Sequence, residues 1–63
     1  MSPGRQVLFE FTQIGNAVKV TALDSASLVE VSVMGPATAS QAQMKAAALR
    51  KLEYMLAKKR GGA

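Results

Sequence analysis

Residues 38–60, TASQAQMKAAALRKLEYMLAKKR, constrain the fold more than any other stretch of the chain. On a helical wheel of about 100° per residue, the apolar side chains share one arc of about 140°. These side chains are Met44, Ala48, Leu49, Leu52, Met55 and Leu56. An apolar arc of this width is typical of a helix that lies on a sheet. We expect Ser40 to cap this helix, with Gln43 completing a capping box; Thr38 with Gln41 is the alternative.

The chain before this helix alternates with a period of two, which predicts strands. In RQVLFEFTQI, residues 5–14, apolar side chains at odd positions alternate with mostly polar ones. Gly and Asn at residues 15–16 then form a two-residue hairpin turn, because both tolerate positive φ. The second strand is AVKVTAL, residues 17–23. This turn places Phe11 opposite Val20, and the resulting register separates apolar from polar side chains.

A third strand is expected at LVEVSVM, residues 28–34, after a turn at DSAS, residues 24–27. If Leu23 and Leu28 close this turn, one face of the sheet collects nine apolar side chains. They are Val7, Phe9, Phe11, Val18, Val20, Ala22, Val29, Val31 and Val33. Gly and Pro at residues 35–36 end the strand, since proline cannot extend a ladder. The predicted fold class is α+β: a three-stranded antiparallel meander, in order 1-2-3, with one C-terminal helix packed on one face (βββα).

Residues 1–63 are enough for one small domain. The apolar fraction, 49%, is that of a globular chain. We expect disorder at residues 1–4, which are polar and contain proline, and at residues 61–63, where glycines end the helix. The sequence has no secretory signal and no transmembrane run of ~20 apolar residues. Together with the absence of cysteine, this favours a cytoplasmic protein.

The composition offers little catalytic chemistry. Without histidine or cysteine, the chain lacks the commonest general base, the best nucleophile and the usual zinc ligands. The expected register places Glu10 and Glu30 on either side of Thr21, about 10 Å apart, and paired carboxylates can do acid/base work. No cleft is expected around them, and Lys19 lies nearby as a counter-charge. With no glycine-rich phosphate loop either, the sequence predicts a protein that is not an enzyme and has no cofactor or metal.

Two surfaces are candidates for binding. The net charge of +4 mildly favours anionic partners, and the outer side of the helix sets a tyrosine among cations, as nucleic-acid binders do. The candidate nucleic-acid contacts are Arg50, Lys51, Tyr54, Lys58, Lys59 and Arg60. The alternative is an ordinary solvated helix end.

The second candidate surface is the sheet face away from the helix. The expected register aligns Leu8, Leu23 and Leu28 in a row there, which favours self-association or a protein partner. A second row contains Ile14, Ala17 and Met34. The outer edge of the third strand has one charge and no proline or lysine, so two copies could join there into a six-stranded dimer. The alternatives are that the chain folds over the leucine row, and that the segment leading to the helix shields the edge.

Two resemblances follow from these stretches. Through LFEFTQIGNAVKVTA, VSVMGPA and ALRKLEYMLAKKR, nearly the whole chain resembles a family of small bacterial proteins, a domain of unknown function. This resemblance implies a real domain and no particular activity. The three strands and the helix after GPATAS resemble the later part of a double-stranded RNA-binding domain. That family has an additional first helix and several lysines at the start of its last helix, where SQAQMK has only Lys45, so its RNA-binding residues are not transferred to this chain.

These observations lead to two functional hypotheses. The first is a small non-enzymatic interaction module, with a homodimer formed through the open sheet face or a strand edge. The second is a nucleic-acid or ribosome-associated binder that uses the basic side of the helix.

Overall fold

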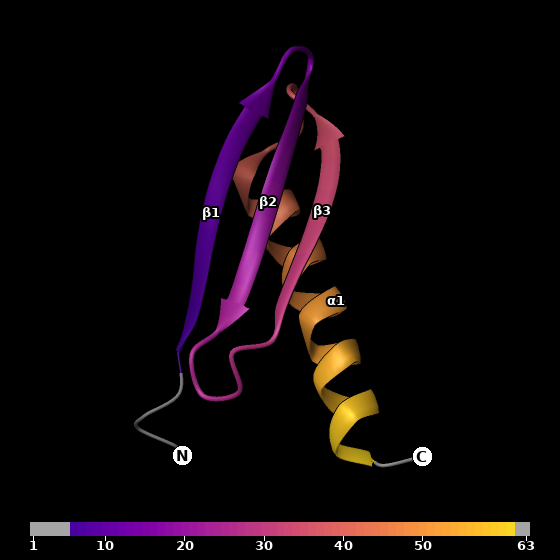
Figure 1. The fold of residues 1–63 in the computed structure, drawn as a ribbon. Coiled ribbons are helices and arrows are strands. Elements are labelled where there is room, and N and C mark those ends of the chain that lie inside the picture. Colours follow the sequence, from indigo (N-terminus) through magenta and orange to yellow (C-terminus); the bar gives the residue numbers. More distant parts are fainter. Residues whose placement is uncertain (1–5, 62–63) are drawn as a thin grey trace.

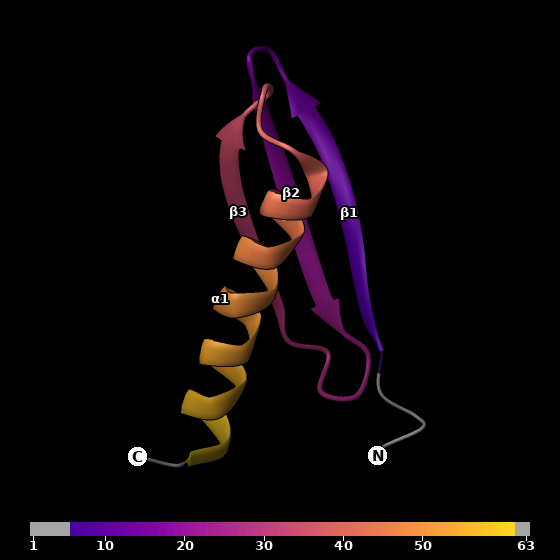
Figure 2. The ribbon, with the colours of Figure 1, turned by 180° about the vertical axis from the view of Figure 1, so that it is seen from behind.

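The computed structural model describes residues 6–61, with side chains to residue 59. Its elements, in chain order, are β1 (Val7–Ile14), β2 (Ala17–Asp24), β3 (Glu30–Pro36) and α1 (Gln41–Gly61). The three strands form an antiparallel sheet in the order β1-β2-β3, and α1 packs on one face of it (Figures 1 and 2). The predicted α+β class, the meander and the C-terminal helix are therefore confirmed.

The first hairpin has the predicted register. Phe11 pairs with Val20 and Phe9 pairs with Ala22. At the turn between them, Gly15 has a φ of 60°, and its neighbour Asn16 does not share this positive value. A positive φ at the first of two loop residues is the pattern of a type II′ turn, one of the two expected types.

The third strand begins and ends two residues later than predicted, at Glu30–Pro36 instead of residues 28–34. Because β2 extends through Asp24, the loop occupies residues 25–29 and Val31 pairs with Ala22. A shift of two residues leaves every side chain on its predicted face, since strand side chains alternate with a period of two. The prediction that proline ends the strand before residue 36 is also wrong.

Pro36 fits at the end of β3 for a geometric reason. The main-chain N–H of Ala37 donates to the carbonyl of Asn16, at 2.9 Å. In an antiparallel ladder the hydrogen-bonded residues alternate, so the main-chain nitrogen of Pro36 is directed away from β2. Proline at this position therefore removes no hydrogen bond of the sheet.

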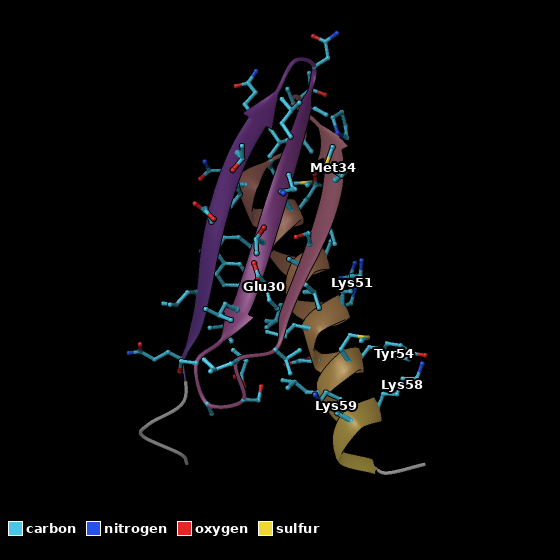
Figure 3. The ribbon with its side chains drawn as sticks, in the orientation of Figure 1. Glu30, Met34, Lys51, Tyr54, Lys58 and Lys59 are labelled. Carbon is cyan, nitrogen blue, oxygen red and sulfur yellow. The ribbon has the colours of Figure 1, made fainter. Side chains whose placement is uncertain are left out.

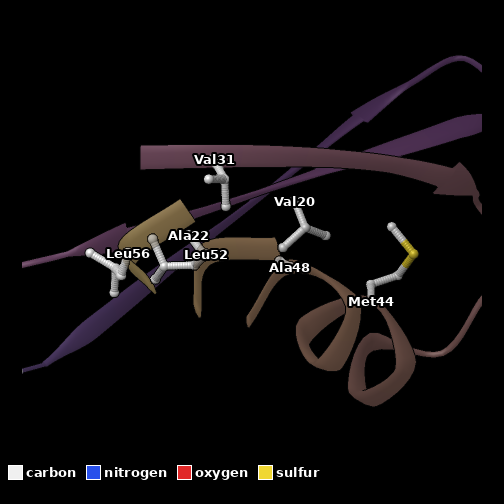
Figure 4. Packing of buried hydrophobic residues seen from close by; sticks show 7 residues of the cluster. All are labelled: Val20, Ala22, Val31, Met44, Ala48, Leu52 and Leu56. Carbon is white, nitrogen blue, oxygen red and sulfur yellow. The ribbon is translucent and has the colours of Figure 1, made fainter. Parts of the chain in front are cut away.

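The core lies between the sheet and α1 (Figure 4). Its buried side chains are Val20, Ala22, Val31, Met44, Ala48, Leu52 and Leu56. The other six apolar residues predicted for the inner face are half-buried and pack against this core: Val7, Phe9, Phe11, Val18, Val29 and Val33. Gly35 leaves room for the helix, because a Cβ there would lie 2.6 Å from the Sδ atom of Met44.

The start of α1 confirms the predicted N-cap. The Oγ atom of Ser40 accepts a hydrogen bond from the main-chain N–H of Gln43, at 3.1 Å, so Ser40 is the N-cap. At the other end α1 extends to Gly61, the first residue of the segment that was expected to be disordered. Glycine tolerates helical dihedral angles, although it does not favour them. The predicted disorder of residues 1–4 and 62–63 lies outside the described residues.

The helix crosses the sheet obliquely, as Figure 2 shows. Near its start, the Nζ atom of Lys45 lies 5.1 Å from the centre of the Phe9 ring on β1. Further along, the Nζ atom of Lys51 donates a hydrogen bond of 2.9 Å to the main-chain carbonyl of Ser32 on β3. The helix packs mainly on β2 and β3. Consequently β1 is the least covered strand.

Candidate interaction surface

The sheet face that α1 leaves uncovered is called the open face here, and Figure 3 looks onto it. Its side chains are those of Leu8, Glu10, Thr12, Ile14, Ala17, Lys19, Thr21, Leu23, Glu30, Ser32, Met34 and Pro36. Three large apolar side chains on this face are more than half exposed: Leu8 at 53%, Ile14 at 53% and Met34 at 58%. Polar and charged residues separate them. The open face is thus a mixed surface, with a make-up that interfaces and ordinary protein surfaces share.

The register of β3 changes the predicted leucine row. Leu8 pairs with Leu23, as expected, but Leu23 pairs with Glu30 on its other side. Leu28 lies in the loop before β3, where it is 72% exposed and has a φ of 63°. The predicted row of three leucines is therefore not formed. The predicted second row is also broken, because Met34 pairs with Lys19.

The same shift separates the two carboxylates that were expected to flank Thr21. Glu10 does pair with Thr21, but the residue on the other side is Ser32. The hydroxyl oxygens of Thr21 and Ser32 lie 3.1 Å apart and share a hydrogen bond. Glu30 lies beside Leu23 instead. Within residues 6–61, no three acidic side chains, or other common ligands, come together as a possible metal site.

Asp24, which was predicted only as a turn residue, organises the loop that sets this register. Its side chain is 2% exposed. One carboxylate oxygen, Oδ2, accepts hydrogen bonds from the main-chain N–H of Ser27 at 3.0 Å and from its hydroxyl at 2.6 Å. The main chain of Asp24 also donates to the carbonyl of Val29 and accepts from the N–H of Leu28. Asp24 follows Val20 and Ala22 at a spacing of two residues, so its side chain lies on the same, buried face of the strand. This spacing is the signal that could have predicted its burial.

Leu28 occupies a backbone conformation that costs a residue with a side chain about 1–2 kcal/mol. We expect Leu28→Gly to raise the free energy of unfolding by about 0.5–1 kcal/mol, because glycine relieves this strain but adds entropy to the unfolded chain. Leu28→Ala is the matched control, since it removes the same exposed side chain and keeps the Cβ. Urea denaturation of the three proteins measures the difference. A Leu28→Gly protein less stable than the Leu28→Ala protein would contradict this account of the loop.

The two edges of the sheet differ. On β3, the outward carbonyl of Ser32 already accepts the hydrogen bond from Lys51, so the helix partly occupies the edge that the sequence had indicated for pairing. On β1, the N–H of Ser25 donates to the carbonyl of Gln6 at 2.8 Å. Hydrogen-bonded residues alternate along an antiparallel pair of strands, so the even residues of β1 bond to β2 as Gln6 bonds to Ser25. The main-chain groups of the odd residues are therefore directed away from β2. They are Val7, Phe9, Phe11 and Gln13, and no described residue forms a hydrogen bond with their main-chain groups.

A shallow groove of about 340 Å³ opens on the helix side of the sheet, next to the β1 edge. Its walls come from β1, β2, the segment before α1 and the first turn of the helix. The lining residues are Phe11, Gln13, Val18, Ala37, Ala39, Gln41 and Met44. The groove exposes both polar and apolar surface, and none of its lining side chains is charged. It therefore offers no counter-charge for an anion.

The predicted nucleic-acid contacts are only partly brought together. The Nζ atom of Lys58 lies 5.9 Å from the centre of the Tyr54 ring, which is 64% exposed, and both side chains extend away from the sheet (Figure 3). Arg50 and Lys59 are exposed. Lys51 is also exposed but is held by β3, and the side chain of Arg60 lies outside the described part of the chain.

Comparison with known proteins gives one match. A family model described as a domain of unknown function, DUF6898, matches residues 4–59. No curated protein and no solved structure matches the chain. Over the residues described, the helix is not apolar enough along its length to cross a membrane.

Proposed function

We propose that this chain, which belongs to the family DUF6898, a domain of unknown function, is a small non-enzymatic interaction module that forms a homodimer through the uncovered parts of its sheet. The observation that carries the proposal is the one-sided covering of the sheet. The helix buries one face, while Leu8, Ile14 and Met34 remain more than half exposed on the other. Three large apolar side chains left exposed on a face that no described element covers support an interaction site there.

The size of the chain supports a second copy as the partner. A domain of about 60 residues buries only roughly 60% of the surface of its unfolded chain, and small domains often gain stability by association. The strand edge also carries main-chain donors and acceptors that an identical edge can satisfy. The proposal keeps the cytoplasmic setting expected from the sequence, because the fold contains no cysteine that would require an oxidising compartment.

The test is sedimentation equilibrium of the purified chain over a wide range of concentrations. We expect the average mass to rise from that of one chain to that of two. Leu8→Glu should shift this transition to higher concentration, because it places a charge on the exposed apolar surface of β1. Tyr54→Glu is the control, since Tyr54 is similarly exposed but lies on the helix. A chain that keeps the mass of a monomer at the highest concentration would refute the proposal.

The basic side of α1 supports a second candidate function, binding to nucleic acid or to ribosomal RNA. The observation in its favour is the exposed Tyr54 ring with the Lys58 ammonium beside it, because a ring and a cation together can stack on a base and neutralise a phosphate.

Fluorescence anisotropy with mixed RNA and DNA oligonucleotides tests this second function. We expect binding at about 50 mM salt that weakens steeply as salt rises, and a smaller slope for the Arg50→Gln, Lys58→Gln double variant. Lys45→Gln is the control because it removes a charge near β1, on another part of the helix. A chain that binds neither oligonucleotide at the lower salt concentration would exclude this function.

A further inference from the structure

We propose that the second copy pairs antiparallel with β1 along its outer edge, about a two-fold axis that passes between the two Phe11 residues. The result is a six-stranded sheet with both helices on the same face. This inference rests on the proposed function, because it specifies how the homodimer forms. It also moves the pairing edge from β3, the edge indicated by the sequence, to β1.

The first support is the hydrogen-bonding state of the two edges. The odd residues of β1 direct four main-chain N–H and four carbonyl groups outward, along a strand of eight residues without proline or lysine. An edge of this kind pairs readily with another strand. The β3 edge is less suited to pairing, because Lys51 occupies one of its carbonyls and the strand ends in proline.

The second support is the choice of register. The odd residues of one β1 strand must lie opposite the odd residues of the other, because only these residues direct their main-chain groups away from β2. The candidate two-fold registers therefore centre on Phe9, Glu10 or Phe11. Centring on Glu10 sets two carboxylates directly opposite each other, which is unfavourable. Centring on Phe9 sets Leu8 opposite the partner's Glu10.

Centring on Phe11 gives compatible pairs at each step. On the open face, Leu8 faces the partner's Ile14, and Glu10 faces the partner's Thr12. These pairs join the two most exposed apolar residues of β1. The apolar row of Leu23 and Leu8 then continues into Ile14 and Ala17 of the partner subunit, across four strands.

The third support comes from the helix side of the sheet. Phe9 and Phe11 are only half-buried, since α1 packs mainly on the other two strands. In the register centred on Phe11, the two Phe11 rings lie side by side. The partner's Phe9 lies opposite Gln13, a residue that lines the groove. Pairing would therefore cover the apolar surface that the helix leaves exposed on β1.

Opposite charges introduced at Thr12 test this register. In the dimer, Thr12 faces the partner's Glu10 twice, once on each side of the axis. Thr12→Glu should lower the association constant by about tenfold, and Thr12→Lys should raise it by about threefold to tenfold. Within one chain Thr12 faces Lys19, so the effects on unfolding should have the opposite signs. This opposition separates a change in dimerisation from a change in folding.

A proline at Gln13 tests the edge itself. Gln13→Pro removes an outward N–H that β2 does not use, so the chain should fold but associate at least tenfold more weakly. Gln13→Ala is the matched control: it also removes the side-chain hydrogen bond to the carbonyl of Gly15, but keeps the N–H. Circular dichroism checks that each variant is folded, and sedimentation gives the association constants.

The outcomes distinguish the two proposals. If the unmodified chain does not associate, the proposed function fails and this inference fails with it. If it dimerises but the Thr12 and Gln13→Pro variants associate normally, the β1 pairing is wrong while the homodimer stands. If Gln13→Pro weakens association but the two Thr12 variants behave alike, the register centred on Phe11 is wrong. Weaker association for Thr12→Glu and Gln13→Pro, and tighter association for Thr12→Lys, is the expected result.

Discussion

Leu52→Ala is expected to lower the free energy of unfolding by about 2–5 kcal/mol, the usual cost of removing a fully buried leucine side chain. Leu52 has no exposed surface and lies at the middle of the helix face that covers the sheet. A domain of this size has a total stability of only a few kcal/mol, so a large fraction of the variant should be unfolded at 25 °C. Urea denaturation followed by far-ultraviolet circular dichroism measures the change.

Tyr54→Ala is the control for this experiment. Tyr54 lies in the same helix, two residues away, but is 64% exposed, so its removal should change stability by no more than about 0.5 kcal/mol. Equal losses for the two variants would mean that the helix stabilises the fold through its own propensity and not through this buried face.

Asp24→Ala should have the second largest effect, a loss of about 2–3 kcal/mol. The replacement removes a buried carboxylate that accepts both the N–H and the hydroxyl of Ser27. Part of the loss arises because the N–H of Ser27 is left without this acceptor. Thermal denaturation and urea denaturation both report it. The loop should also lose order, which amide exchange at Leu28 and Val29 would detect.

Asp24→Asn and Ser27→Ala separate the contributions to this loss. Asparagine keeps one side-chain oxygen as an acceptor, and Ser27→Ala removes only the hydroxyl, so each should cost less than Asp24→Ala. The double variant Asp24→Ala, Ser27→Ala should lose less than the sum of the two single losses, because both remove the same hydrogen bond. Additive losses would show that the carboxylate acts mainly through another contact.

Most of the fold could be predicted because its elements are regular. The alternation around Phe9 and Phe11 fixes one face of the first strand, and the Gly-Asn turn fixes the register of the first hairpin. The helix face containing Leu52 follows from the spacing of its apolar residues. Local periodicity also determines the side of each residue in β3, because an error of two residues in register does not change the face.

The loop after β2 could not be predicted from composition. DSAS marks a turn, but whether Asp24 starts the turn or ends the strand depends on burial of its carboxylate. In the structure Asp24 belongs to the strand, and Leu28 accepts the left-handed conformation that closes the loop. The prediction assumed that Leu28 starts the third strand and faces Leu23 across the turn. That assumption produced the leucine row and the misplaced Glu30.

The difference between the β1 and β3 edges could not be predicted from the sequence either, because it depends on how the helix lies across the sheet. Periodicity assigns Lys45 and Lys51 to a polar helix surface, but it does not place them beside the two outer strands, β1 and β3. Their contacts with Phe9 and Ser32 follow from the oblique crossing of the helix over the sheet, which Figure 2 shows. The sequence indicated the β3 edge for pairing, whereas the contact of Lys51 with that edge leads us to propose β1 instead.

The order of the elements has a consequence for the chain while it is being synthesised. The strands leave the ribosome first, and the helix that covers their apolar face is the last element of the fold to be made. Until α1 emerges, the nascent sheet has no internal cover for the side chains around Val20 and Val31. Exposed strands of this kind are prone to aggregate. A ribosome that stalls within the helix-coding segment would therefore carry an aggregation-prone nascent chain. Chaperones should bind this chain more strongly than they bind the finished domain.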